Sequence, residues 1–254
     1  MEGTPEEAVH ACGLSGTTGM VVNTWLKPSE RIPSIKSVAV GMASQRAVEA
    51  ANLAAVGVTA PDDALETALL RLESLADLPF RKHPFARLGH RWTSLRNIIK
   101  AYPAQISTQA AIEATIALYH KGIRADRVQK LTLYGHRTVA GGVQGSREAF
   151  TPRSREAADH STSYVVAMAL KRGKLTLREY DGGPWETDEV REIMSRIELV
   201  VDPERDRAMV QQGVLGVRLV AELEDDSREE VEIHQPKGHP DAPLDEAGLL
   251  NKMT

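Results

Sequence analysis

The feature that most constrains the fold is a change of hydrophobic pattern near Pro79. Before this proline, residues 34–56 form an alanine-rich run that fits a helix, and a second helical run begins at Asp62 with carboxylates in its first turn. After it, short β-like runs alternate with helical runs, which is typical of a sheet with helices packed against it. We therefore predict an α+β fold in three parts: the remainder of an all-helical domain over 1–80, an α+β domain over 81–236, and a tail over 237–254 that returns to the helical domain.

The elements of the second part follow from local pattern and from the residues that end them. We predict helices over 107–120, 156–171 and 187–197, strands over 127–136 and 174–180, and a β-hairpin from 216–223 and 229–234. Gly57 and Gly173 follow the ends of two predicted helices, where glycine commonly adopts a left-handed conformation. The glycine-rich stretch 13–20 matches no nucleotide-binding motif, so we predict a turn between helices there.

Composition excludes several classes of protein. The mixed charges sum to a formal net charge of -4, which gives no broad basic face for nucleic acid. No stretch reaches the roughly 18 apolar residues of a membrane-spanning helix, and the acidic amino terminus does not resemble a secretory signal. We therefore expect a cytoplasmic protein with no membrane partner. The single cysteine, Cys12, cannot close an internal disulfide or hold an iron–sulfur cluster, and the histidines lack metal-ligand spacing, so we expect no metal.

Two lysines are candidate ligands for an anion. Lys36 lies at the start of the helix predicted over 34–56, where its ammonium and the free amides of the first turn can hold a carboxylate. Lys100 precedes Tyr102 and a proline-fixed turn, at the mouth of the helix that begins around Ser107. The competing interpretations are a solvated surface lysine for Lys36 and an ordinary loop lysine for Lys100.

The stretch ADHSTSY carries a second group of candidates at a predicted helix start. His160 and Tyr164 are four residues apart, which places them on one face of the predicted helix. Asp159 and Ser161 are explained at least as well as helix caps. His239 lies in a loop rich in proline and glycine, where an imidazole can reach an anion or transfer a proton. An exposed loop histidine is the competing interpretation.

Four blocks of sequence, in this order and spacing, resemble blocks of the MmgE/PrpD family from about residue 25 onward. They are SIKSVAVGMASQRAVEAANLAAVGVTAP, IIKAYPAQISTQAAIEATIALYHKGI, ADHSTSYVVAMALKRGKLTLREY and PKGHPDAPLDEAGLLNKM. The family contains 2-methylcitrate dehydratases of propionate catabolism, cis-aconitate decarboxylases and an iminodisuccinate epimerase. The resemblance implies an all-helical domain and a smaller α+β domain around a site for di- or tricarboxylates, a homodimer, and catalysis without a metal or organic cofactor.

The resemblance also implies roles for single residues. It identifies Lys36 and Lys100 as active-site lysines and Tyr164 as an active-site tyrosine, with His160 beside it in the same motif. The further candidate substrate ligands are Tyr102, Ser107 and His239.

The chain departs from the family pattern in two respects. Family members are nearly twice as long, and the part without a counterpart here supplies further acidic, threonine and histidine site residues. Ser107 stands near a position where dehydratases of the family often carry a histidine. Both departures concern proton transfer, on which the specific reaction depends.

Taken with the resemblance, these residues predict a lyase similar to 2-methylcitrate dehydratase that eliminates water from a small polycarboxylate. Lys36 and Lys100 would hold the carboxylates, while Tyr164 or His160 would donate or relay the proton. Three alternatives stay open: an enzyme completed by a separate amino-terminal subunit, a non-catalytic family remnant that acts as a binding or dimerising module, and an incomplete gene sequence.

Overall fold

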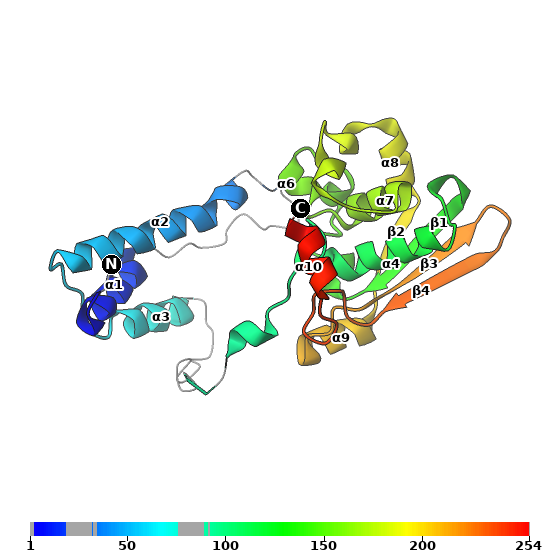
Figure 1. Cartoon of the computed structure of the whole chain (residues 1–254). Helices are drawn as coiled ribbons and strands as arrows, with labels where there is room; N and C mark the ends of the chain where they lie inside the picture. Colours follow the sequence, from blue (N-terminus) through cyan, green and yellow to red (C-terminus); the bar gives the residue numbers. More distant parts are fainter. Residues whose placement is uncertain (1–2, 19–31, 33–34, 76–88, 91, 254) are drawn as a thin grey trace. The chain divides into compact units, whose positions relative to one another are not determined.

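The computed structural model describes residues 3–18, 32, 35–75, 89–90 and 92–253. The chain forms two compact units, a helical unit of residues 1–25 and 34–91 and an α+β unit of residues 26–33 and 92–254. Helices and one mixed four-stranded sheet confirm the predicted α+β class (Figure 1). Among the described residues, no helix is long and apolar enough to cross a membrane.

The helical unit consists of α1 (Pro5–Thr18), α2 (Ile35–Ala55) and α3 (Ala64–Leu75). Helix α1 packs against both α2 and α3. The buried side chains of α2 are all alanines, at positions 39, 50 and 54, and their small size lets a neighbouring helix approach closely. The helices predicted over 34–56 and from Asp62 are confirmed, and Gly57 follows α2 with a φ of +88°.

The turn predicted over 13–20 is wrong for its described part, because α1 continues to Thr18. Close packing explains why α1 carries glycine at positions 13 and 16. A Cβ added to Gly13 would lie 2.8 Å from the Cβ of Ala60, and one added to Gly16 would lie 3.2 Å from Cδ1 of Leu65. These glycines therefore let α1 approach the residues that lead into and begin α3, and residues 19 and 20 lie outside the described residues.

The α+β unit is built on a sheet with the strand order β2-β1-β3-β4. Its strands are β1 (Val128–Gly135), β2 (Ile197–Val201), β3 (Val217–Leu223) and β4 (Arg228–Ile233). Strand β1 pairs parallel with β2 and antiparallel with β3, and β3 and β4 form the predicted hairpin. Along β3, Val217 and Leu219 are fully buried while Arg218 between them is partly exposed, so one face of the sheet carries the core.

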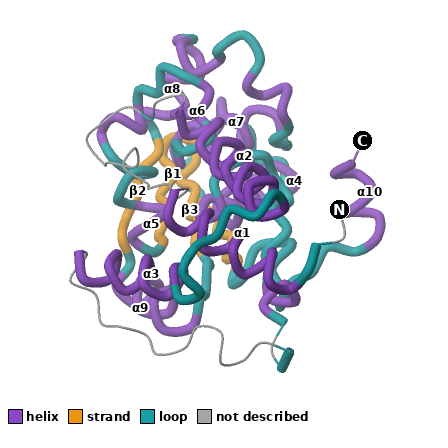
Figure 2. The backbone as a smooth tube through the Cα atoms, turned by 90° about the vertical axis from the view of Figure 1, so that its left-hand side faces the viewer, coloured by secondary structure: helices purple, strands orange, loops and turns teal. Residues whose placement is uncertain are grey.

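The described helices of the α+β unit are α4 (Gln109–His120), α5 (Arg137–Ala140), α6 (Arg155–Ala158), α7 (Thr162–Arg172), α8 (Asp188–Ser195), α9 (Pro203–Gln212) and α10 (Glu246–Met253). Of these, α4, α5, α7 and α8 contact strands of the sheet. Helices α4 and α7 pack against each other, α4 also contacts β3 and β4, and α7 also contacts β2 and α8 (Figure 1). Helix α5 lies beside β1 and β2 (Figure 2). Leu118 of α4, Leu170 of α7 and Leu131 of β1 are buried in the shared core.

The single helix predicted over 156–171 is instead two helices, α6 and α7, separated by residues 159–161. The Ser161 hydroxyl accepts a hydrogen bond from the backbone amide of Tyr164, which begins α7 as a new helix. The capping interpretation of Ser161 is therefore confirmed. His160 precedes α7, so the prediction that His160 and Tyr164 share one helical face is wrong. Gly173 ends α7 with a φ of +68°, as predicted.

The strand predicted over 174–180 is also wrong. Thr176 and Glu179 form a capping box at the start of a short 3-10 helix, Leu177–Tyr180. The Thr176 hydroxyl accepts a hydrogen bond from the amide of Arg178, and the Glu179 carboxylate accepts one from the amide of Thr176. Strand β2 was not predicted, because its apolar run directly follows the helical pattern of α8. Helix α9 was also not predicted. The tail contains α10, and its return to the helical unit stays a prediction.

Candidate functional site

Three segments that are distant in sequence meet near the start of α4. The backbone amide of Gln105 donates to the carbonyl of Asp159 at 3.0 Å, and the amide of Ile99 donates to the carbonyl of Gly238 at 2.9 Å. These bonds join the loop before α4 to the turn between α6 and α7 and to the loop before α10. Most candidate residues belong to these segments: Lys100, Tyr102, Ser107, His160 and His239.

Gly238 is required where the loop before α10 meets the loop before α4. Its φ of +86° lies in the left-handed region that favours glycine, and an added Cβ would lie 1.8 Å from the carbonyl oxygen of Ile99. The following residue, His239, accepts a hydrogen bond at Nδ1 from the amide of Asp241 at 3.1 Å. The imidazole of His239 is therefore partly buried and oriented by its own loop.

Lys100 and Tyr102 lie in the loop before α4. The Lys100 ammonium is exposed and donates to the carbonyl of Ala104 at 3.0 Å, which folds the side chain back over the loop. Burial, with a smaller contribution from the Glu113 carboxylate, raises the pKa of Tyr102 to about 12. The Tyr102 phenol therefore keeps its proton at neutral pH, which leaves its hydroxyl able to donate a hydrogen bond.

Ser107 is buried at the end of the same loop. Its backbone amide and its hydroxyl both donate to the side-chain oxygen of Gln105. The buried Gln109 amide closes the loop from the other side, since its oxygen accepts from the amide of Tyr102 at 2.9 Å and its nitrogen donates to the carbonyl of Tyr102 at 3.1 Å. Ser107 and Gln109 thus hold the loop in shape.

His160 has the geometry of a proton-transfer group. The residue is 8% exposed, and Nδ1 binds the carboxylate of Asp159. A carboxylate at one ring nitrogen orients the imidazole and fixes the proton on Nδ1, which leaves Nε2 able to accept a proton. His160 also lines a pocket, so this nitrogen belongs to a group that a bound molecule can reach.

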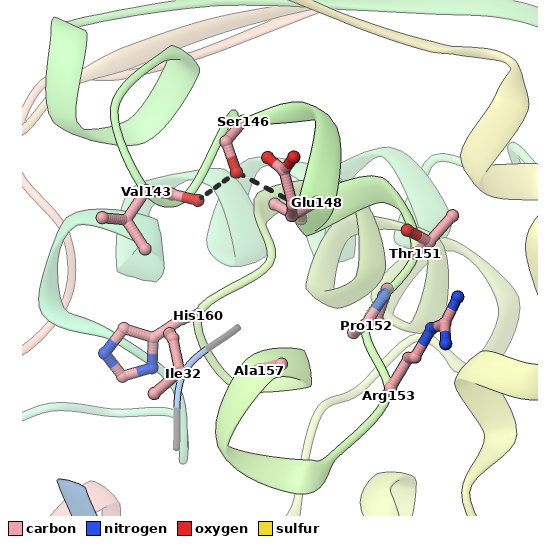
Figure 3. Close-up of a pocket in the computed structure, with 10 residues that line it drawn as sticks. Ile32, Val143, Ser146, Glu148, Thr151, Pro152, Arg153, Ala157 and His160 are labelled. Carbon is pink, nitrogen blue, oxygen red and sulfur yellow. Dashed lines mark hydrogen bonds between the residues drawn. The ribbon is translucent and has the colours of Figure 1, made fainter. Parts of the chain in front are cut away.

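The pocket has a volume of about 230 Å³ and lies within the α+β unit (Figure 3). In this view Val143 and His160 lie on one side of it, and Thr151, Pro152 and Arg153 lie on the opposite side. The lining residues are Ile32, Val143, Ser146, Glu148, Ala149, Thr151, Pro152, Arg153, Ala157 and His160. The lining therefore combines an imidazole, a guanidinium, a carboxylate and hydroxyl groups.

Tyr164 lies in the core and does not line this pocket. Its side chain is fully buried, and its hydroxyl donates to the backbone carbonyl of Glu179. The rings of Tyr180 and Trp185 pack around it, with centroids 5.7 and 5.8 Å away. Burial raises the pKa of Tyr164 above its ordinary value, so the phenol stays protonated.

Lys36 belongs to the helical unit, where it is the second residue of α2 and partly buried. Because the other candidates belong to the α+β unit, a role for Lys36 in the same site stays a prediction. Among the described residues, no three histidine, cysteine, aspartate or glutamate side chains form a group that could hold a metal ion.

The sequence analysis missed the charged and hydroxyl-bearing residues of the loop between α5 and α6. Glu148, Thr151 and Arg153 line the pocket, yet none belongs to a known motif. The available signal was the run REAFTPRS, which carries a proline and ends three residues before the ADHSTSY block.

Comparisons with known proteins identify the family to which the chain belongs. The family model of the MmgE/PrpD C-terminal domain matches residues 102–254. Over 93% of its length the chain is 26% identical to the 2-methylcitrate dehydratases of Escherichia coli strain K12 and Salmonella typhimurium strain LT2, and 25% identical to that of Cupriavidus necator. The chain spans about half the length of these curated relatives, 50% of the first two and 49% of the third. Because the family model matches more than half of it, the chain belongs to the MmgE/PrpD family.

Proposed function

We propose that the chain is a lyase of the dehydratase type, which eliminates water from a small polycarboxylate without a cofactor. The observation that carries the proposal is the buried His160 imidazole, held by the Asp159 carboxylate in the lining of a small pocket. The similar proteins named 2-methylcitrate dehydratase support the same reaction class. Their name also makes 2-methylcitrate the first compound to test.

In the proposed reaction, Nε2 of His160 takes a proton from the carbon beside a substrate carboxylate. The hydroxyl on the neighbouring carbon is protonated by an acid and leaves as water, so a carbon–carbon double bond forms. Lys36 and Lys100 hold carboxylates and stabilise the negative charge that develops on them. The further substrate ligands in this proposal are Tyr102, Ser107 and His239.

We assign Tyr164 a supporting role instead of the proton transfer suggested by the family resemblance. Its hydroxyl is already bound to the carbonyl of Glu179, and its raised pKa opposes loss of the proton. Tyr164 instead fixes the start of α7, and therefore the position of the His160 turn, against the core.

A helical partner is the second part of the proposal. Helix α2 exposes apolar side chains within its unit, with Val40 74%, Val48 61% and Met42 51% exposed. Apolar residues around a whole helix are typical of a helix that is covered on all sides. We propose that a separately encoded amino-terminal subunit covers this surface, and a homodimer is the alternative outcome.

The test compares His160→Gln with His120→Gln, which removes an exposed imidazole from the end of α4. Formation of the conjugated double bond is followed by ultraviolet absorbance with 2-methylcitrate or citrate as substrate. We expect His160→Gln to lower kcat by roughly a hundredfold or more, because this is the usual contribution of a general base, and His120→Gln to leave it unchanged. Equal rates for the two variants would contradict the assignment of His160.

A non-catalytic role makes a different prediction in the same experiment. A binding or dimerising module would bind carboxylates without producing the double bond, with or without the partner subunit. Turnover that depends on His160 therefore excludes the module, whereas binding without turnover supports it.

A further inference from the structure

The pocket beside His160 contains a cation that the proposed reaction does not use. Arg153 lines the pocket on the side opposite to His160 (Figure 3). It is exposed, and no hydrogen bond or ion pair to another described residue involves its guanidinium. Among the ten described residues that line the pocket, Arg153 is also the one permanent cation.

We propose that Arg153 binds a carboxylate of the ligand and that Glu148 accepts a hydrogen bond from the ligand's hydroxyl group. This inference rests on the proposed function, because the ligand occupies the same pocket as the His160 imidazole. The ligand is a hydroxy-carboxylate, as elimination of water already requires, and the inference names the two side chains that recognise its carboxylate and its hydroxyl group.

The chemistry of the two side chains supports this class. A guanidinium presents a planar set of donors that matches a carboxylate with two parallel hydrogen bonds. Glu148 also lines the pocket, and its ionised carboxylate can only accept hydrogen bonds. A second ligand carboxylate beside Glu148 would be repelled, whereas a hydroxyl there can donate to it.

The size of the pocket agrees with a small ligand. Its volume of about 230 Å³ is below the roughly 300 Å³ at which pockets for drug-sized molecules begin. Its aliphatic lining, from Ile32, Val143 and Pro152, suits the carbon skeleton of a short branched acid. His160 then faces a ligand whose carboxylate is fixed by Arg153.

Binding is measured by isothermal titration calorimetry on the full chain, with citrate and with tricarballylate, which lacks the hydroxyl of citrate. The variants are Arg153→Gln, Arg153→Lys and Arg147→Gln, the last of which removes the same charge from an exposed arginine of the same loop that does not line the pocket. We expect Arg153→Gln to weaken citrate binding roughly tenfold, Arg153→Lys to weaken it less, and Arg147→Gln to change it less than about twofold. Glu148→Gln should reduce the preference for citrate over tricarballylate.

The inference is overturned if Arg153→Gln and Arg147→Gln weaken citrate binding equally, or if the unsubstituted chain binds no citrate. Failure of the inference and failure of the proposed function give different results. Turnover with binding that does not depend on Arg153 removes this site but keeps the lyase. Binding that depends on Arg153 without turnover keeps the site but removes the lyase.

Discussion

Tyr164 carries a hydroxyl group in the core of the α+β unit, where its bond to the carbonyl of Glu179 satisfies both buried groups. Replacing it with phenylalanine leaves that carbonyl without its partner. We predict that Tyr164→Phe lowers the free energy of unfolding by about 1–3 kcal/mol, measured by urea denaturation. The control is Tyr134→Phe, since Tyr134 is partly exposed on β1. Equal losses in the two variants would contradict the role assigned to the Tyr164 hydroxyl.

His136 is a second buried polar residue, and its state depends on pH. It is fully buried after β1, and neither ring nitrogen has a partner among the described residues. Burial lowers the pKa of His136 below its ordinary value of 6.5, although the Asp206 carboxylate opposes this shift. The folded state therefore keeps His136 neutral at a pH where the unfolded chain already binds a proton.

The consequence is a loss of stability in acid. Above pH 6.5 His136 is neutral in the folded and in the unfolded chain. As the pH falls from 6.5 toward the lowered pKa of the folded state, the free energy of unfolding falls by at most about 1.4 kcal/mol per pH unit. We predict that His136→Leu makes the stability less dependent on pH between about 6.5 and 5, as measured by urea denaturation at several pH values. The control His120→Leu, at an exposed position, should keep the slope of the unsubstituted chain, and an unchanged slope in His136→Leu would exclude this mechanism.

At the scale of elements, the loop before α10 positions the loop before α4 through Gly238. We predict that Gly238→Ala is strongly destabilising, because its Cβ would collide with the Ile99 carbonyl as well as strain the backbone. Gly213→Ala is the matched control: its φ is +73°, but no atom lies within 4 Å of the added Cβ. The control should lose about 1–3 kcal/mol, and Gly238→Ala should lose clearly more by thermal denaturation. Similar losses would show that the contact with Ile99 is not important.

The elements also show which parts of the structure the sequence can predict. Long periodic runs such as α2 and α4 were predicted, as was the β-hairpin, because their pattern is local. At the break over residues 159–161 the Asp159 carbonyl accepts a hydrogen bond from the amide of Gln105, and α1 runs through Gly13 where the helix lies close to Ala60. Such tertiary contacts leave no periodic signal in the sequence.

The candidate site follows the same division. Lys100 and His160 were candidates because they lie near predicted helix starts, and the family resemblance implied their roles. The structure joins their two segments by a backbone hydrogen bond between Gln105 and Asp159. The sequence could not separate His160, which lines the pocket, from Tyr164, which lies in the core. It also missed Arg153, because the residues that line this pocket come together only in the folded chain and follow no fixed spacing in the sequence.

At the scale of the whole molecule, the exposed apolar side chains of α2 should govern solubility. We predict that the isolated chain self-associates with increasing concentration, and that the double substitution Val40→Lys and Val48→Lys suppresses this, since both side chains are exposed. The control adds the same charges at exposed polar positions of the same helix, Ser44→Lys and Asn52→Lys. Analytical ultracentrifugation measures the result, and equal suppression in both variants would attribute it to charge alone.

The most direct test of the account measures double-bond formation from 2-methylcitrate by the purified chain, alone and with a co-expressed amino-terminal helical subunit. We predict that ultraviolet absorbance rises in at least one of these preparations and that His160→Gln abolishes the rise. If the absorbance stays flat in both preparations while circular dichroism shows a folded protein, the lyase assignment is contradicted and a non-catalytic binding module takes its place.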